Sequence, residues 1–180
     1  CAGTACQACG CLPVAKALAA ELDRKELTDK VRRCKTGCHG FCEQGPLMLI
    51  GPWNLFYHHV KPGDVKDIVR ETVAKGIPIE RLLYTDPATG VTAQTEDQIP
   101  FYKAQTPTLL SQNKRIDAKS IQDYFAIGGY TALSKVRNSM SPEEVIMEVE
   151  ASGLRGRGGG GFPTAKKWAA CRAAPGEEKY

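Results

Sequence analysis

Apolar residues recur at helical spacing in two stretches of the first half of the chain. The first stretch begins at Pro13, a residue suited to a first helical turn, and its apolar face is formed by Val14, Leu18 and Leu22. The second begins at Pro62 and stops at Gly76, and its apolar face is formed by Val65, Ile68, Val69 and Val73. The pattern therefore predicts two amphipathic helices.

Three short segments between these two helices predict strands. Residues 31–35 predict one short strand. Residues 47–50 and 55–60 are separated by turn-forming residues 51–54, which predicts a β-hairpin. Helices and strands together predict a compact α/β unit that ends near Tyr84.

Residues 86–119 have a different composition. They contain prolines at positions 87, 100 and 107 and many threonine, glutamine and aspartate residues. This composition predicts a connector that is extended in large part. Its apolar patch, Ile99-Pro100-Phe101-Tyr102, is expected to dock on a neighbouring element.

The residues after the connector predict helices separated by glycine. Residues 120–127 and 130–136 predict two short helices. Ser141-Pro142-Glu143-Glu144 has the form of a capping box with proline at the first helical position, so it predicts the start of a third helix. That helix is expected to end at Gly153.

Composition narrows the class of protein. The chain has 180 residues, of which 42% are hydrophobic and 24% charged, so it is expected to fold rather than to be disordered. The net charge of +4 is too small to indicate nucleic-acid binding. No apolar run approaches the about 18 residues of a membrane span, so we expect no membrane-spanning segment. Because the chain starts at Cys1 and stops at Tyr180 without a cap, we expect it to be a fragment.

Cysteines are concentrated at the start of the chain. Seven of the eight cysteines lie within the first 42 residues. Cys1 and Cys6 have C-x4-C spacing, and Cys38 and Cys42 have C-x3-C spacing. Four thiolates in two pairs are typical of an iron–sulfur cluster or of structural zinc.

Spacing alone leaves the ligand set open. Cys6 and Cys9 have a zinc-like C-x2-C spacing, and Cys34-x3-Cys38 matches as well as Cys38-x3-Cys42. Disulfides are a further alternative, although a chain of this size needs no covalent staples.

The cysteine segments resemble one family. Cys1-Ala-Gly-Thr-Ala-Cys6 and Thr36-Gly-Cys-His-Gly-Phe-Cys-Glu-Gln-Gly-Pro46 are similar to the thioredoxin-like [2Fe-2S] ferredoxins. The resemblance implies a [2Fe-2S] cluster held by Cys1, Cys6, Cys38 and Cys42. It leaves Cys34 as an extra cysteine and Cys171 without a role, and we expect Cys9 and Cys11 to be small buried residues.

A glycine-rich loop lies between Gly153 and a last helix, which is predicted from near Pro163 to about Arg172. Residues 156–161 spell G-x-G-x-x-G, but they follow a capped helix rather than a strand, which argues against a Rossmann fold. Glycines before a helix N-terminus favour an anion cradle, and basic residues surround it at Arg155, Arg157, Lys166 and Lys167. A flexible linker is the alternative interpretation.

The same loop resembles a second family. Residues 152–168 are similar to the FMN- and NADH-binding signature of the flavoprotein subunit of complex I and of diaphorase subunits of NAD-linked hydrogenases and formate dehydrogenases. The resemblance implies that Phe162 stacks on the nicotinamide ring. It also implies that FMN contacts Gly156, Arg157, Gly158, Gly159 and Lys167.

The order of the two similar regions implies a domain layout. We expect a thioredoxin-like [2Fe-2S] ferredoxin domain at 1–85, a connector at 86–119, and at 120–180 the helical, glycine-loop start of a complex I flavoprotein-like domain. In such subunits residues 175–180 would lead into a segment that completes the flavin pocket. A [4Fe-4S] cluster is expected only in the missing C-terminal part, and this fragment alone is expected to be inactive.

The resemblances together imply an electron-transfer oxidoreductase subunit. It would pass electrons between NAD(P)H, FMN and iron–sulfur clusters in a cytoplasmic multi-subunit complex, of hydrogenase or formate dehydrogenase type and in some cases electron-bifurcating. Its expected partners are NADH and iron–sulfur subunits of the same complex, with no nucleic acid. His39, inside the cluster loop, is expected to face solvent.

Two other functions remain open from the sequence. One is a zinc-stabilised binding module with a basic glycine-rich tail, and the other is an assembly subunit with a vestigial cluster. The [2Fe-2S] and zinc hypotheses differ in colour and metal content.

Overall fold

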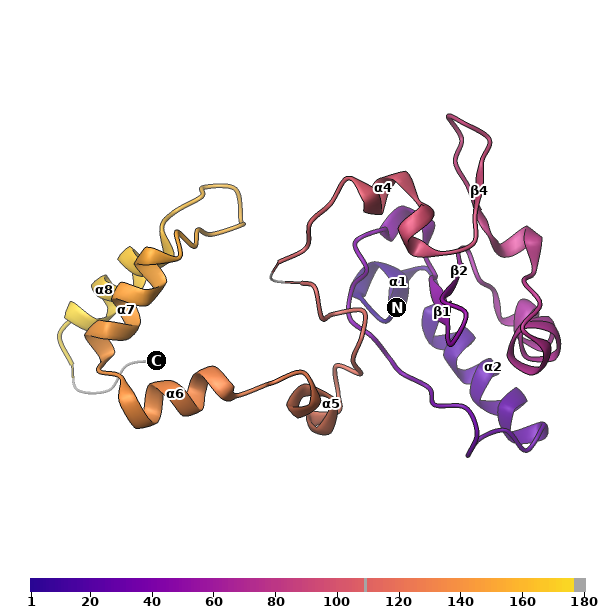
Figure 1. Ribbon diagram of the computed structural model, residues 1–180, viewed down its shortest axis with the longest axis horizontal. Helices are drawn as coiled ribbons and strands as arrows, with labels where there is room; N and C mark the ends of the chain where they lie inside the picture. Colours follow the sequence, from indigo (N-terminus) through magenta and orange to yellow (C-terminus); the bar gives the residue numbers. More distant parts are fainter. Residues whose placement is uncertain (109, 177–180) are drawn as a thin grey trace. The chain divides into compact units, whose positions relative to one another are not determined.

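The computed structural model describes residues 1–108 and 110–176. The chain divides into two compact units, Cys1–Ile127 and Gly128–Tyr180, which are described separately (Figure 1). The first unit combines helices with two small antiparallel hairpins, and the second is helical in its described residues.

Helix α2 (Cys11–Arg24) confirms the first predicted helix and begins two residues before Pro13. Gly10, at φ 95°, precedes it in a left-handed conformation that favours glycine. Val14 and Leu22 on its apolar face are buried, with 4% and 0% of their surfaces exposed. The short helix α1 (Thr4–Ala8), which the sequence pattern did not predict, comes before it.

The predicted hairpin is present with shorter strands. Strands β1 (Met48–Ile50) and β2 (Leu55–Tyr57) pair antiparallel, with Met48 opposite Tyr57. Tyr57 is fully buried, and its hydroxyl donates to Thr72 Oγ1 at 2.7 Å while accepting from the Ile79 N–H at 2.9 Å. The hairpin therefore joins the main core through both packing and satisfied polar groups.

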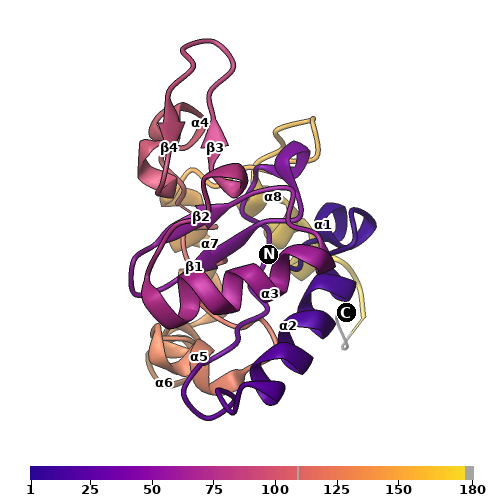
Figure 2. The same cartoon turned by 90° about the vertical axis from the view of Figure 1, so that its right-hand side faces the viewer.

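The second predicted helix is a composite. A 3-10 turn (Pro62–Asp64) leads into α3 (Val65–Asp67), which continues as a π-helical turn (Ile68–Val73). Gly76, at φ 72°, ends it as predicted. Its apolar face packs with α2 and the β1–β2 hairpin to form the main core, and α2 and α3 lie side by side (Figure 2).

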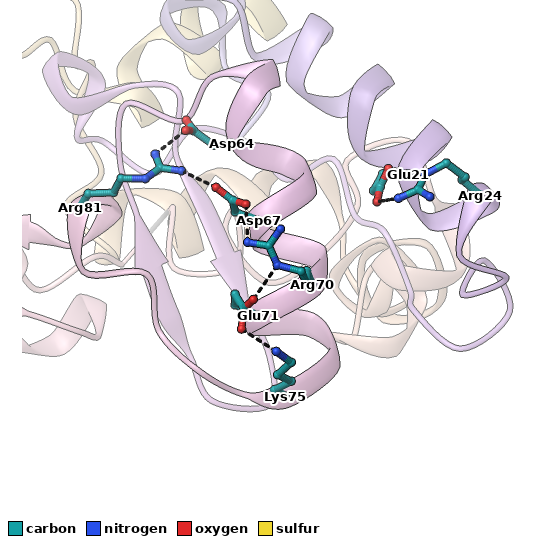
Figure 3. Close-up of polar contacts among 8 residues, drawn as sticks. All are labelled: Glu21, Arg24, Asp64, Asp67, Arg70, Glu71, Lys75 and Arg81. Atoms are coloured by element: carbon teal, nitrogen blue, oxygen red, sulfur yellow. Dashed lines mark hydrogen bonds and ion pairs between the residues drawn. The ribbon is translucent and has the colours of Figure 1, made fainter.

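The outer face of this composite helix carries a chain of ion pairs (Figure 3). Arg81 contacts Asp64 and Asp67, the latter at 3.1 Å. Arg70 bridges Asp67 and Glu71 at 2.7 and 2.6 Å. These pairs tie the segment after the helix back to its first turns, although exposed ion pairs stabilise a fold only weakly.

The predicted strand at residues 31–35 is wrong. No strand is present there, because the segment bonds to a later part of the chain rather than to a sheet edge. The Lys35 N–H donates to Asp117 Oδ2 at 3.1 Å, and the Ala118 N–H donates to the Lys35 carbonyl at 3.3 Å. The Gly37 N–H donates to the Asn113 carbonyl at 2.8 Å.

The first half of the predicted connector has more regular structure than expected. Strands β3 (Tyr84–Thr85) and β4 (Thr92–Ala93) form a hairpin, and α4 (Pro100–Lys103) follows a 3-10 turn (Glu96–Gln98). Ile99 is fully buried in a second core. That core comprises Cys6, Cys11, Phe41, Leu47, Phe56, Ala93 and Ile99. The expectation that this apolar patch docks on a neighbour is confirmed.

Residues 113–123 form a segment that we call the strap, because it lies along residues 32–37. Besides the backbone bonds already given, Asp123 forms an ion pair with Arg32. Helix α5 (Ile121–Ala126) begins inside the strap, and Ser120 caps it by accepting from the Asp123 N–H at 3.2 Å. The strap therefore belongs to the first unit.

The second unit contains the helices predicted for it. They are α6 (Thr131–Ser139), α7 (Pro142–Ala151) and α8 (Thr164–Ala173). The capping box of α7 is confirmed, since Ser141 Oγ accepts from the Glu144 N–H at 3.2 Å and Glu144 Oε2 accepts from the Ser141 N–H at 2.7 Å. Helices α7 and α8 pack together, and Arg172 pairs with Glu143. Among the described helices of both units, none has the length and apolar character that crossing a bilayer requires.

Candidate metal centre and cofactor loop

Two segments place the predicted cysteine ligands in one region of the first unit. Cys6 lies on α1 and is 2% exposed. Cys38 and Cys42 lie on the loop that ends in the 3-10 turn Cys42–Gln44. The Ala2 N–H donates to the Thr36 carbonyl at 2.9 Å, and the Cys1 amino group donates to the Leu47 carbonyl at 3.0 Å. These bonds hold the first residues of the chain against the second cysteine loop.

The second cysteine pair is arranged to chelate one metal. Cys38 Sγ and Cys42 Sγ are 3.7 Å apart. Two thiolates bound to one tetrahedral metal at about 2.3 Å would lie about 3.8 Å apart. The Gly40 N–H also donates to Cys38 Sγ at 3.3 Å. Such backbone donors stabilise a thiolate and orient it.

Two glycines allow the cysteine segments to approach closely. A Cβ on Gly3 would lie 3.1 Å from Cys38 Cβ, and a Cβ on Gly45 would lie 3.1 Å from Cys6 Sγ. Each glycine thus brings one predicted ligand against the segment of the other pair. Side chains at these two positions would push the two segments apart.

The thiols are electrostatically coupled. Burial raises the pKa of Cys6, and a hydrogen bond with Cys38 raises the pKa of Cys42. Burial also lowers the pKa of the Cys1 amino group. The thiols of Cys6, Cys11 and Cys38 act in the opposite direction and raise this pKa. The clustered thiols hold their protons when no metal is present. A bound metal ion would replace those protons, so the cluster of sulfurs favours a cation.

The donor set fits a sulfur-ligated group, although the four predicted ligands are not fully assembled. Within residues 1–108 and 110–176, no group of three or more His, Cys, Asp or Glu side chains is placed to hold a metal ion. The structure shows one chelating pair, Cys38 and Cys42, with buried Cys6 beside Gly45 and Cys1 tied to Leu47. The assignment of all four as ligands remains a prediction.

The remaining cysteines differ in burial. Cys11 is buried, as expected, whereas Cys9 is exposed, so the expectation that it is a small buried residue is wrong. Cys9 ends α1 as its C-terminal cap, where the helix turns outward before Gly10. Cys34 and Cys171 are exposed, and all eight cysteines are free thiols.

His39 does not face solvent, so that expectation is wrong. Its ring is buried between the cysteine loop and the connector, where Nε2 lies 2.9 Å from Thr36 Oγ1 and Nδ1 lies 3.9 Å from Glu96 Oε2. Glu96 also pairs with Lys114 of the strap. Burial lowers the pKa of His39 to about 4, so the ring is neutral at neutral pH. No sequence signal indicated this burial, because Glu96 and Lys114 both come from the predicted connector.

Tyr102 is a second residue that sequence reasoning did not assign to the site. It packs on the second core from α4, and its hydroxyl is buried without a hydrogen-bond partner among the described residues. Its pKa is raised by burial, by Glu96 and by the thiols of Cys38, Cys6 and Cys42. Tyr102 therefore lies beside the cysteine site, on the core that contains Cys6.

The glycine loop of the second unit is closed at its base. The Gly156 N–H donates to the Phe162 carbonyl at 2.9 Å, and the Thr164 N–H donates to the Leu154 carbonyl at 3.0 Å. Arg155 Nη1 donates to the Gly161 carbonyl at 3.1 Å. The loop thus stands at the N-terminus of α8, where backbone N–H groups can meet an anion.

The predicted cofactor residues lie on and beside this loop. Phe162 is 51% exposed, and Arg157 and Lys167 are exposed. Gly159 has φ 116°, and a Cβ on Gly158 or Gly159 would meet no atom within 4 Å. The loop surface is therefore open to a ligand, and the roles of Gly156, Arg157, Gly158, Gly159, Phe162 and Lys167 remain predictions.

A small α/β unit that brings two thiols within 3.7 Å of each other is typical of a cysteine-ligated metal site. Residues 1–73 match the family described as thioredoxin-like [2Fe-2S] ferredoxin. This part of the chain belongs to that family, whose defining group is a [2Fe-2S] cluster.

The similarity to known proteins extends beyond residues 1–73. The chain is 50% identical over 84 residues to a NADH-quinone oxidoreductase subunit of Aquifex aeolicus, covering 46% of this chain and 20% of the relative. It is 29% identical over 155 residues to the NAD-reducing hydrogenase HoxS subunit alpha of Cupriavidus necator, covering 81% of this chain and 22% of the relative. The chain thus spans about a fifth of the length of these relatives.

A solved thioredoxin-like [2Fe-2S] ferredoxin from Aquifex aeolicus is 32% identical in sequence. The match covers 43% of this chain and 71% of the ferredoxin, with a TM-score of 0.41.

Proposed function

We propose that the chain is the N-terminal part of an NAD(P)H-oxidising subunit that transfers electrons within a multi-subunit oxidoreductase complex. The observation that carries the proposal is the Cys38–Cys42 thiol pair, 3.7 Å apart, inside a domain of the [2Fe-2S] ferredoxin family. Similarity to subunits of NADH-quinone oxidoreductase and of NAD-reducing hydrogenase supports the link to NAD.

In this proposal the first unit holds the cluster through Cys1, Cys6, Cys38 and Cys42. When bound, a [2Fe-2S] cluster supplies one-electron transfer. The protein's part is to supply thiolates, to orient Cys38 through the Gly40 N–H, and to shield Cys6 from water.

The second unit supplies part of a nucleotide site. The loop before α8 offers backbone N–H groups, and Arg157 and Lys167 add positive charge for the phosphate of FMN. Phe162 offers an exposed aromatic face for the nicotinamide of NADH. The partners would be further iron–sulfur subunits of the complex, and a [4Fe-4S] cluster would belong to the part beyond this chain.

We assign this function to the cytoplasm, a reducing compartment in which cysteine thiols stay available as ligands. The division into a ferredoxin domain at 1–85, a connector at 86–119 and the start of a flavin domain at 120–180 belongs to the same proposal.

Metal analysis tests the proposal directly. Purified anaerobically, the chain is expected to be brown, to contain about two irons and to bleach with dithionite. Cys42→Ser removes one arm of the chelating pair and is expected to lose the visible absorption and most of the iron. Cys34→Ser, at an exposed cysteine outside the predicted set, is the matched control and is expected to keep both.

A colourless protein with about one zinc per chain would contradict the electron-transfer function and support the zinc-stabilised binding module. Loss of iron in Cys34→Ser with retention in Cys42→Ser would instead overturn the ligand assignment while leaving the cluster in place.

A further inference from the structure

Tyr102 comes to the cysteine site from outside the matched ferredoxin domain. It lies on α4, whereas the family match ends at residue 73. Its ring packs edge-on against Phe41, with ring centroids 5.6 Å apart, and against Phe56 at 5.9 Å. Phe41 lies on the loop between Cys38 and Cys42, so this packing fixes the tyrosine against the loop of the chelating pair.

The Tyr102 hydroxyl is buried and unpaired among the described residues. Buried polar groups in native proteins are nearly always hydrogen-bonded, so an orphaned one points to a partner outside the described residues. Glu96, whose charge acts on Tyr102, is already engaged by Lys114. The Lys114 ammonium lies over the Tyr102 ring, 5.4 Å from its centre.

Tyr102 packs on the core that contains Cys6, and the charged and titratable groups that act on its hydroxyl are Glu96 and the thiols of Cys38, Cys6 and Cys42. A phenol keeps its proton at neutral pH, since its ordinary pKa is about 10. It can therefore act as a hydrogen-bond donor toward sulfur, which accepts.

We propose that the Tyr102 hydroxyl donates a hydrogen bond to a sulfur of the metal centre, and so favours its reduced form. The inference rests on the proposed [2Fe-2S] function and adds a positioning and tuning residue from the connector. A donor to sulfur stabilises the more negative state, because the reduced centre carries more charge on its sulfurs. The connector thereby contributes to the electron-transfer property of the domain that it packs on.

Tyr102→Phe removes only the hydroxyl oxygen and keeps the ring that packs on Phe41. An anaerobic redox titration followed by electron paramagnetic resonance is expected to show a lower midpoint potential. The equilibrium should shift toward the oxidised form by about threefold to tenfold, tenfold being about 59 mV for a one-electron step. Iron content and visible absorption should match the unsubstituted protein.

Tyr84→Phe is the matched control. Tyr84 packs on Phe41 with ring centroids 5.3 Å apart, but the pKa of its hydroxyl is raised by burial, Asp86 and Glu43 rather than by the thiols. Its potential is expected to stay unchanged. A purely structural effect of losing a tyrosine hydroxyl from this aromatic cluster would shift both variants alike.

If Tyr102→Phe does not fold, a second variant tests the role of the hydroxyl. Site-specific replacement of Tyr102 by 3-fluorotyrosine makes the phenol a stronger donor and should raise the midpoint potential. An unchanged potential in a folded, iron-loaded variant would overturn the role of Tyr102 and leave the cluster intact. Absence of iron from the unsubstituted protein would instead be a failure of the proposed function.

Discussion

At the scale of single residues, buried carboxylates attach the strap to the first unit. Asp123 is 9% exposed, and its oxygens accept from the Asp117 N–H at 2.9 Å and from the Ser120 hydroxyl at 3.1 Å. It also pairs with Arg32 on the segment that leads to the cysteine loop. One side chain thus joins two stretches of chain about 90 positions apart.

Asp123→Asn is expected to destabilise the first unit at neutral pH, because it removes the charge that Arg32 and two donors satisfy. The Asp117 N–H, Ser120 and Arg32 lower the pKa of Asp123 below its ordinary value of 3.8. A lowered folded-state pKa gives stability that is complete above the unfolded value and is lost as the pH falls through the folded value.

The gap between the urea midpoints of Asp123→Asn and the unsubstituted protein should therefore be constant from about pH 5 to pH 8 and close only below pH 3.8. Asp29→Asn, at an exposed aspartate of the same unit, is the control and should show no such gap. A gap that already closes near neutral pH would contradict the assignment to Asp123.

At the scale of elements, glycine determines where the composite helix can stop. Gly76 has φ 72°, and its N–H donates to the Thr72 carbonyl at 2.8 Å. A Cβ at this position would lie 2.8 Å from Trp53 of the hairpin turn. The helix end and the hairpin turn therefore depend on one residue without a side chain.

Gly76→Ala is expected to lower the free energy of unfolding by at least about 1 kcal/mol, since the left-handed conformation disfavours a Cβ and the indole must move. Gly63→Ala is the control, because its Cβ would meet nothing within 4 Å and its φ is ordinary. Urea unfolding of both variants measures the difference. Equal midpoints would show that Trp53 and the backbone adjust without cost.

At the scale of the whole molecule, the chain divides into two compact units after Ile127. Asn113 and Asp117 accept hydrogen bonds from the N–H groups of Gly37 and Lys35, and the Ala118 N–H donates to the Lys35 carbonyl, so the strap is bound to residues 35–37. The exposed Gly128 marks the start of the second unit. A short glycine-containing link thus separates the units.

Brief digestion with a protease of low sequence specificity is expected to cut first near Gly128-Gly129 and to release a fragment ending close to Ile127. The strap should be protected, because its backbone groups are bonded to the first unit. Mass spectrometry identifies the first cuts. Early cuts at residues 113–118 would show instead that the strap is detached in solution, as expected for a free connector.

The elements that neighbouring residues determine were predicted correctly, whereas the element that depends on a distant segment was not. The helix beginning near Pro13, the hairpin at residues 47–60 and the capping box at Ser141 follow from spacing, turn residues and caps, and all three are confirmed. The strand predicted at residues 31–35 is wrong, because an extended segment becomes a strand only where a partner edge is available. Its partner is the strap, which carries no strand signal.

At the cysteine site, too, the local features were predicted and the long-range ones were not. Spacing drew attention to Cys38 and Cys42, and the structure brings their thiols together. The buried state of His39 and the orientation of Tyr102 could not be predicted, because they depend on segments that lie 57 or more positions away along the chain.

The sequence by itself determined the local elements, the clustering of cysteines and the position of the glycine loop before a helix, because caps, turns and periodicity act over a few residues. Only the tertiary structure decided that the connector packs over the cysteine loop, that Cys9 is exposed while Cys11 is buried, and that the Tyr102 hydroxyl is buried without a partner among the described residues. These features depend on contacts between distant segments, which form when apolar surface is buried and polar groups must then find partners.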